Sequence, residues 1–314
     1  MTAALLKVAA QLVLLLLLSP LITGLIRTLK ARLQMRRGPG PLQPYREIHK
    51  LMRKGMVVPD TASWLFSATP YVVFLATLLA GLMVPMVAAD TPVGLFGGVL
   101  AVVYLLGLGR FFLALGGLDT GSSFGGLGSS REMTISALAE PTLMLAVFTV
   151  AIGAGSTAMA EMVRTAIGQQ WHFLAPSQIL AFAALFLVLI AETGRLPVDN
   201  PATHLELTMI HEAMILEYSG PYLALIEWGA SIKQLLLMTL LINIFWPFGL
   251  PAGWSSASGV LAGLGWLVAK LAVLSCGIVL VETANAKMRL FRVPELMAVA
   301  FTLGALALVS TFLF

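Results

Sequence analysis

Long apolar segments alternate with short polar ones along almost the whole chain. Most of the apolar segments approach the roughly 20 residues that an α-helix needs to cross a bilayer, which gives about eight crossings. The predicted spans are residues 4–26, 71–89, 95–118, 134–153, 178–192, 223–245, 259–281 and 294–313. The fifth is the shortest. The pattern therefore predicts an all-α polytopic membrane protein.

Composition supports this fold class and narrows the chemistry. Of 314 residues, 59% are hydrophobic and 11% are charged, whereas soluble domains carry about 25% charged residues. The first apolar run continues into a basic flank without a small-residue cleavage site, so we expect a retained helix. The one cysteine, Cys276, allows no disulfide within the chain and cannot build an iron–sulfur site by itself. With no repeat or low-complexity linker evident, residues 1–314 are predicted to form a single transmembrane domain.

Lysine and arginine gather in the loops before the second and the last predicted spans. The loops after the second and sixth spans have none. The residues are Arg27, Lys30, Arg32, Arg36, Arg37, Arg46, Lys50, Arg53 and Lys54, and then Lys287, Arg289 and Arg292. Because basic loops stay in the cytoplasm, both termini are predicted to lie outside it. This loop bias explains the net charge of +4 better than nucleic-acid binding does.

The first basic loop combines a turn-rich hinge with a short amphipathic cytoplasmic helix, predicted over residues 45–56. One interpretation is an interfacial helix held by anionic lipid. The other is a docking surface for a soluble partner, which we favour because attraction to lipid needs no defined turn. The predicted docking residues are Arg36, Arg37, Gly38, Pro39, Gly40, Arg46 and Lys50.

Residues 118–132 form a second, glycine-rich cytoplasmic loop in this prediction. Ser129 or Ser130 is expected to cap the helix that follows. The loop lacks a Gly-Lys-Ser/Thr ending and follows no strand, which argues against nucleotide binding. Glu140 comes next, just before Pro141, where we expect the helix to kink or loosen.

A cluster of charge and histidine follows the fifth span. It comprises Glu192, Arg195, Asp199, His204, Glu206, His211, Glu212 and Glu217. Asn200-Pro201 is typical of a helix start, and Gly220-Pro221 of a helix end. The sequence therefore predicts a helix over residues 201–217 that is polar on two sides. Such a helix is expected to be buried in protein or to line a wet cavity.

The histidines and carboxylates of this cluster invite a test for metal binding. His204 and His211 are separated by seven residues, or about 10 Å along a helix, which is too far for one ion. The i,i+4 histidine pair of zinc hydrolases is missing. We therefore expect no metal site, and no redox centre or active site, in this chain itself.

Ionisable residues also occur within the predicted spans, where charge is costly. Carboxylates in a low-dielectric setting bind and release protons closer to neutral pH than carboxylates in water. Paired structural charge at helix contacts is the alternative, and Glu282 is read as an interfacial residue. The predicted proton pathway consists of Glu140, Glu192, Glu206, Glu212, Glu217, Glu227, Lys233 and Lys270.

Several motifs resemble one family over nearly the whole chain. They are Arg36-Arg-Gly-Pro-Gly40 with Gln43, Ile48-His-Lys-Leu51, Ala191-Glu-Thr-Gly-Arg-Leu-Pro-Val-Asp199 and Glu217-Tyr-Ser-Gly220. The chain resembles the heel subunit of respiratory complex I, also called its subunit 1. Phe111-Phe112, Leu118-Asp-Thr-Gly-Ser122, Ser130-Arg-Glu132 and Ile232-Lys-Gln234 resemble the branch in membrane-bound group 4 nickel–iron hydrogenases, such as hydrogenase-4 and formate hydrogenlyase.

The resemblance implies eight transmembrane helices around a chamber near the cytoplasmic face of a prokaryotic inner membrane. It implies soluble large and small hydrogenase subunits and antiporter-like membrane subunits as partners, with the nickel–iron site and iron–sulfur clusters in the soluble ones. Glu192 then belongs to the start of the acidic loop, and Glu140 faces the chamber. Other chamber and acidic-loop residues are Asp119, Arg131, Arg195, Asp199, His204 and His211. Gly194 and Val198 depart from the quinone-reducing pattern, which argues against a bound quinone.

The sequence thus predicts a membrane anchor and coupling subunit of a complex-I-like hydrogenase. It would dock the soluble redox subunits and link electron transfer to proton or sodium translocation. One alternative is the quinone-binding heel subunit of a respiratory NADH dehydrogenase. Another is a stand-alone cation transporter, against which the lack of an evident repeat argues mildly.

Overall fold

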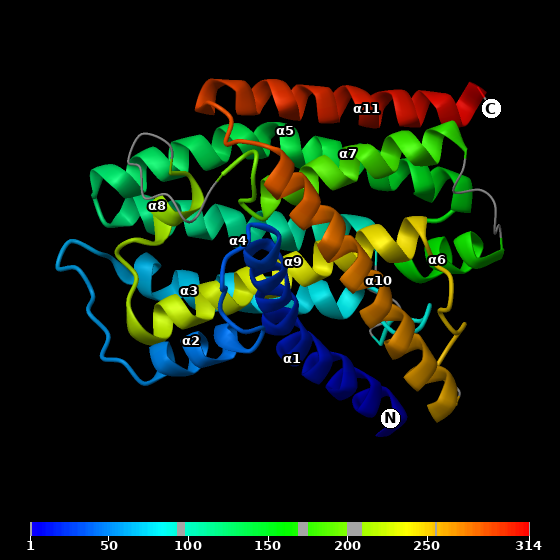
Figure 1. The fold of residues 1–314 in the computed structure, drawn as a ribbon, viewed down its shortest axis with the longest axis horizontal. Helices are drawn as coiled ribbons and strands as arrows, with labels where there is room; N and C mark the ends of the chain where they lie inside the picture. Colours follow the sequence, from blue (N-terminus) through cyan, green and yellow to red (C-terminus); the bar gives the residue numbers. More distant parts are fainter. Residues whose placement is uncertain (1, 93–97, 169–174, 200–208, 255, 314) are drawn as a thin grey trace.

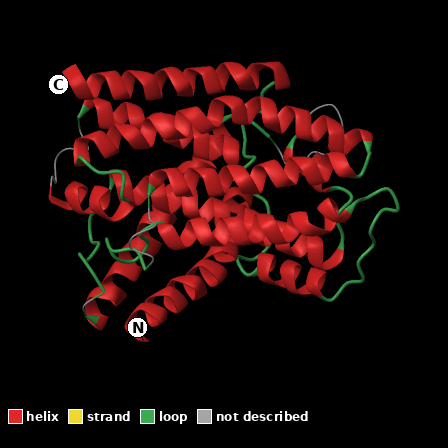
Figure 2. Ribbon diagram, turned by 180° about the vertical axis from the view of Figure 1, so that it is seen from behind, coloured by secondary structure: helices red, strands yellow, loops and turns green. Residues whose placement is uncertain are grey.

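The computed structural model describes residues 2–92, 98–168, 175–199, 209–254 and 256–313, which are helices joined by loops (Figures 1 and 2). Among them, seven helices are long and apolar enough to cross a membrane, and an eighth apolar helix, α7, is shorter. The eight are α1 (Thr2–Leu33), α3 (Trp64–Met83), α4 (Val99–Asp119), α5 (Ser123–Ala154), α7 (Pro176–Glu192), α9 (Gly220–Phe245), α10 (Ala257–Ala284) and α11 (Val293–Leu313). The predicted all-α polytopic fold is confirmed.

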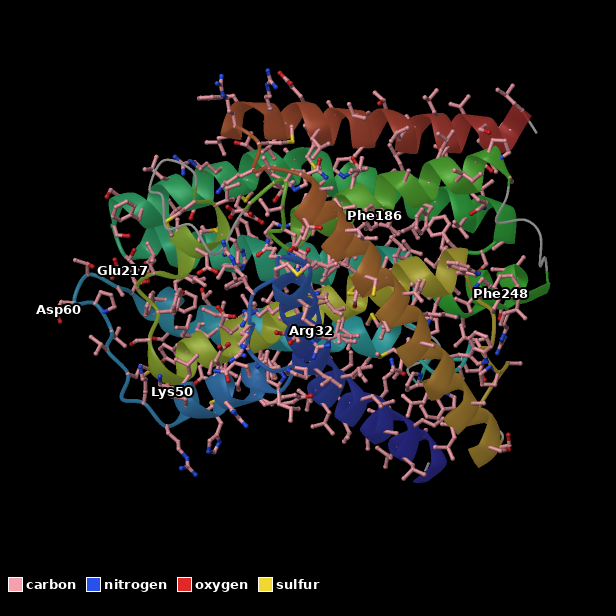
Figure 3. The ribbon with its side chains drawn as sticks, viewed as in Figure 1. Arg32, Lys50, Asp60, Phe186, Glu217 and Phe248 are labelled. Atoms are coloured by element: carbon pink, nitrogen blue, oxygen red, sulfur yellow. The ribbon has the colours of Figure 1, made fainter. Side chains whose placement is uncertain are left out.

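The long helices pack as two groups that share a central contact. On one side α3 packs against α4 and α9, and on the other α11 packs against α5 and α7. The contact between α4 and α5 joins the groups, while α1 and α10 cross them obliquely (Figure 1). Asp60 and Glu217 lie at one end of the molecule, and Phe248 lies at the other end (Figure 3). We call the end with Phe248 the opposite end.

Helix α2 (Gln43–Met52) starts and stops earlier than predicted, because Pro44 occupies its first turn and the chain leaves the helix at Arg53. It packs against α9 and α1. The hinge before it is fixed to α1, since the Thr28 hydroxyl donates to the Pro39 carbonyl at 2.8 Å. A Cβ at Gly24 would lie 2.0 Å from the Pro41 oxygen, so only glycine allows this close approach.

Residues 84–91 fill the opposite end of the bundle and are not helical. The second span, predicted over residues 71–89, therefore ends earlier than expected. Helix α3 stops at Met83 because Pro85 disfavours helical geometry in the residue before it. The buried Gln11 amide donates to the Val84 carbonyl at 2.8 Å, and the buried Asn243 amide donates to the Pro85 carbonyl at 2.8 Å. The Val84 and Pro85 carbonyls, which lie outside the helix, are therefore paired, as membrane depth requires.

The glycine-rich loop is mostly helix. Ser122 caps α5 by accepting from the Gly125 N–H at 3.1 Å, so the prediction of Ser129 or Ser130 as the cap is wrong. Helix α5 starts earlier than predicted because Gly125 lets it approach α4. A Cβ added at Gly125 would lie 2.1 Å from the Gly117 oxygen. Helix α5 continues through Pro141.

Candidate functional site

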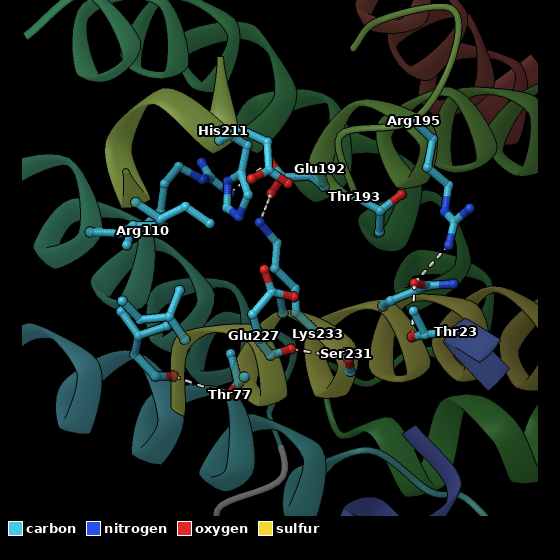
Figure 4. A pocket seen from close by; sticks show the side chains of 18 of the residues that line it. Thr23, Thr77, Arg110, Glu192, Thr193, Arg195, His211, Glu227, Ser231 and Lys233 are labelled. Carbon is cyan, nitrogen blue, oxygen red and sulfur yellow. Dashed lines mark hydrogen bonds and ion pairs between the residues drawn. The ribbon is translucent and has the colours of Figure 1, made fainter. Parts of the chain in front are cut away.

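A cavity of about 200 Å³ lies among α1, α3, α4, α9 and the segment that follows α7 (Figure 4). Such a volume has room for several water molecules. Among the residues that the structure describes, five basic and five acidic side chains line it, so their formal charges balance. They are Arg27, Lys30, Arg110, Arg195 and Lys233, with Glu132, Glu192, Glu212, Glu227 and Glu282. We call this space the charged cavity.

Arg110 on α4 is the centre of the first ion-pair network. Its side chain is only 6% exposed, and its guanidinium lies 2.6 Å from Glu140 on α5 and 2.7 Å from Glu192 at the end of α7. Glu132 lies 3.9 Å away. The second oxygen of Glu192 pairs with Lys233 of α9 at 2.6 Å. Four helices are therefore joined by a network whose central residues, Arg110 and Glu192, are buried, which is costly unless each buried charge has a partner.

Glu282 on α10 is the centre of a second network. Its side chain is 3% exposed, with Arg195 at 2.7 Å and Lys30 at 2.8 Å. Arg195 also donates to the Gln234 side chain at 2.8 Å. The interpretation of Glu282 as an interfacial residue therefore changes, because it links α1, α10 and the segment after α7.

Three residues that line the charged cavity, Glu212, Glu227 and His211, belong to neither ion-pair network as the structure describes them. Glu212 and Glu227 form no ion pair within 4.0 Å to any residue that the structure describes. His211 lines the cavity beside them, and its backbone N–H donates to Asp199 at 3.4 Å. Asp199 in turn pairs with Lys287 at 2.9 Å.

The structure gathers part of the predicted proton pathway and leaves other parts outside. Glu192, Glu212, Glu227 and Lys233 line the charged cavity, and Glu140 adjoins it through Arg110. Glu217 is exposed, and Lys270 lies in α10 without lining that cavity. His204 and Glu206 fall outside the described residues.

The residues predicted to line the chamber do not all lie at one place in the structure. Arg195 and His211 line the cavity, and Arg131 donates to the Met209 carbonyl at 2.7 Å. Asp119 instead accepts from the backbone N–H and the hydroxyl of Ser63, both at 2.7 Å. It thereby holds the start of α3.

The predicted polar helix over residues 201–217 is wrong in its described part. Met209 and Ile210 are not helical, and α8 covers only His211–Ile215. Tyr218 then stacks on Phe66 with ring centroids 4.1 Å apart. Because this buried contact fixes the position of the chain, the helix does not continue beyond Ile215. Gly220-Pro221 begins α9 instead of ending a helix, as proline in a first turn favours.

All seven predicted docking residues are exposed, in the hinge 36–40 and on helix α2.

Four residues of the two ion-pair networks were not predicted as site residues from the sequence, namely Arg110, Lys30, Glu132 and Gln234. The signal for Arg110 was present, because a charged residue in an apolar span is a functional candidate by itself. The described residues hold no group of three or more histidine, cysteine, aspartate or glutamate side chains suited to a metal ion.

Comparisons with known proteins agree with the fold and the motifs. The profile of the family described as NADH dehydrogenase matches residues 6–313. Hydrogenase-4 component C of Escherichia coli (strain K12) is 36% identical over 299 residues, which cover 95% of this chain and 93% of that protein. Formate hydrogenlyase subunit 4 of the same organism is 36% identical over 295 residues, covering 93% and 94%.

A further sequence relative and a chain of a solved structure also match this chain. The H-type subunit of NADH-quinone oxidoreductase from Rubrobacter xylanophilus is 30% identical over 233 residues, covering 70% of this chain and 67% of that protein. A chain from the structure of the membrane-bound sulfane sulfur reductase, an archaeal respiratory membrane complex, has the same fold. Its TM-score is 0.86 at 20% identity, covering 98% of this chain and 99% of that chain. The chain therefore belongs to the NADH dehydrogenase family of membrane proteins, together with hydrogenase-4 component C and formate hydrogenlyase subunit 4.

Proposed function

We propose that this chain is the membrane anchor and coupling subunit of a complex-I-like membrane-bound hydrogenase. It docks soluble redox subunits and links their electron transfer to translocation of protons or sodium ions. Its similarity to hydrogenase-4 component C and formate hydrogenlyase subunit 4 supports this assignment. The nickel–iron site and the iron–sulfur clusters then belong to the large and small soluble partners, because the single Cys276 cannot ligate a cluster alone.

The coupling role is supported by the position of the Arg110 network. It runs from the charged cavity to Glu140, whose side chain is 42% exposed near the middle of α5. A carboxylate facing lipid at that depth is costly. We therefore expect an antiporter-like membrane subunit to cover Glu140 and to receive the effect of redox events through the network.

Glu140→Gln is expected to abolish ion translocation while hydrogen oxidation by an artificial electron acceptor continues at the parent rate. The amide oxygen can still accept from Arg110, so the fold is kept, but the charge is lost. Both rates are measured on the intact complex in sealed membrane vesicles. Glu295→Gln is the control, because Glu295 is exposed on α11 and lies outside the networks. Undiminished translocation in Glu140→Gln would contradict the coupling role.

Arg36→Glu combined with Arg37→Glu is expected to release the soluble subunits from membranes. Both side chains are exposed in the hinge that Thr28 fixes to α1, so reversing their charge removes attraction without disturbing a buried contact. Co-sedimentation of the soluble subunits with washed membranes measures the effect. Arg289→Glu with Arg292→Glu makes the same charge change at two exposed positions elsewhere. If the hinge variant retains the soluble subunits as the control does, the hinge is not the dock.

Quinone binding is the second candidate function, and the similarity to the H-type subunit of NADH-quinone oxidoreductase favours it. The ten charged residues around the charged cavity disfavour it, because small-molecule pockets are mostly apolar with few polar groups. Inhibition of hydrogen oxidation in the intact complex by quinone-site inhibitors would select this candidate over the first.

A further inference from the structure

A second cavity, of about 240 Å³, lies between α1, α2 and α9. We call it the vestibule. In the described part of the chain, four residues line both the vestibule and the charged cavity, namely Thr23, Arg27, Glu227 and Ser231. The two spaces are therefore separated by a shared wall of side chains and not by a helix.

The vestibule suits water better than an apolar molecule. Of the eleven described residues that line it, five are charged, namely Arg27, Glu47, Lys50, Lys54 and Glu227. Arg27 on α1 pairs with Glu47 on α2 at 2.9 Å, and their side chains are 45% and 46% exposed. An ion pair so exposed is hydrated and weak, so it does not seal the vestibule.

Glu227 is the carboxylate in the shared wall. Within the described residues no cation lies within 4.0 Å of it, whereas Glu192 and Glu282 each hold two cations. The titratable or charged groups around it, among the described residues, are Glu212 and His211 of α8, Arg27 of α1 and Glu47 of α2. Glu227 can therefore gain or lose a proton without breaking an ion pair.

We infer that the vestibule beneath α2 is the hydrated route by which protons reach the charged cavity, with Glu227 as the relay in the wall. Hydronium in the vestibule gives a proton to the Glu227 carboxylate, and the resulting carboxylic acid gives a proton to water in the charged cavity. The carboxylate is regenerated, so no other reactant is needed. This inference rests on the proposed coupling function and adds the path of proton uptake.

The test uses the intact complex in vesicles, with Cys276 replaced by alanine because it is exposed. Leu223 lines the vestibule and not the charged cavity. In Leu223→Cys, sulfonatoethyl methanethiosulfonate is expected to label the thiol and to lower ion translocation at least tenfold relative to the same untreated vesicles. Dithiothreitol restores it, and hydrogen oxidation by an artificial acceptor is unchanged. Ser275→Cys is the control, since Ser275 is buried on α10 away from both cavities and should resist labelling.

Glu227→Gln supplies an independent arm, in which translocation is expected to fall at least tenfold without any reagent. Either of two results would overturn the inference: Leu223→Cys stays unlabelled, or the labelled protein and Glu227→Gln both translocate normally. If Glu140→Gln loses translocation while these variants keep it, the uptake route fails and the coupling function stands. If Glu140→Gln also translocates normally, the coupling function itself fails.

Discussion

Arg110→Met is expected to lower the free energy of unfolding by about 3–5 kcal/mol, because removing one partner of a buried ion pair leaves uncompensated charge. Arg110 faces Glu140 at 2.6 Å, Glu192 at 2.7 Å and Glu132 at 3.9 Å, and its side chain is 6% exposed. Lys233 would remain as the cation nearest Glu192. Thermal unfolding of the purified subunit in mild detergent measures the loss as a lowered midpoint.

Arg27→Met is the matched control, since it removes the same charge from an ion pair that is about half exposed. Such pairs contribute about 0–1 kcal/mol, so its midpoint should barely move. Arg110→Lys should fall between the two, because a single ammonium keeps the charge but lacks the planar fork that reaches Glu140 and Glu192 together. Equal midpoints for Arg110→Met and Arg27→Met would show that the network does not stabilise the fold.

The fold was largely predictable from hydrophobic runs, because a helix in lipid must satisfy its own backbone and needs about 20 apolar residues. The errors fall where tertiary contacts override local signals. Residues 84–89 are as apolar as a helix end, yet Pro85 and the amides of Gln11 and Asn243 hold them as buried non-helical chain. The start of α5 at Ser123 depended on close contact between Gly125 and α4, which no local pattern encodes.

The site was predictable as a set of charges but not as a set of pairs. Glu192, Lys233 and Glu227 were identified because charge is costly in a membrane span. Arg110 and Glu192 are 82 residues apart, and Arg195 and Glu282 are 87 apart, so sequence spacing says nothing of their contact. Paired and unpaired carboxylates look alike in the sequence, and only the structure distinguishes Glu227 from Glu192.

Glu192→Gln is expected to abolish ion translocation while hydrogen oxidation by an artificial acceptor stays at the parent rate. Glu192 is 5% exposed and accepts a cation on each oxygen, Arg110 at 2.7 Å and Lys233 at 2.6 Å. An amide offers one acceptor oxygen, so its NH₂ group would face one of the cations, and the link between α4 and α9 would break. Translocation in sealed vesicles and acceptor reduction in the same preparation measure the two effects separately.

The double variant Glu192→Gln with Lys233→Met separates charge balance from coupling. Glu192→Gln alone leaves Lys233 without its carboxylate and should lower the thermal unfolding midpoint. The double variant removes one charge of each sign, so its midpoint should return close to that of the parent protein. Translocation should remain absent, because the carboxylate between Arg110 and Lys233 is still missing. Should the double variant translocate ions, Glu192 would serve only to neutralise Lys233, and the route from the charged cavity to Glu140 would have to bypass it.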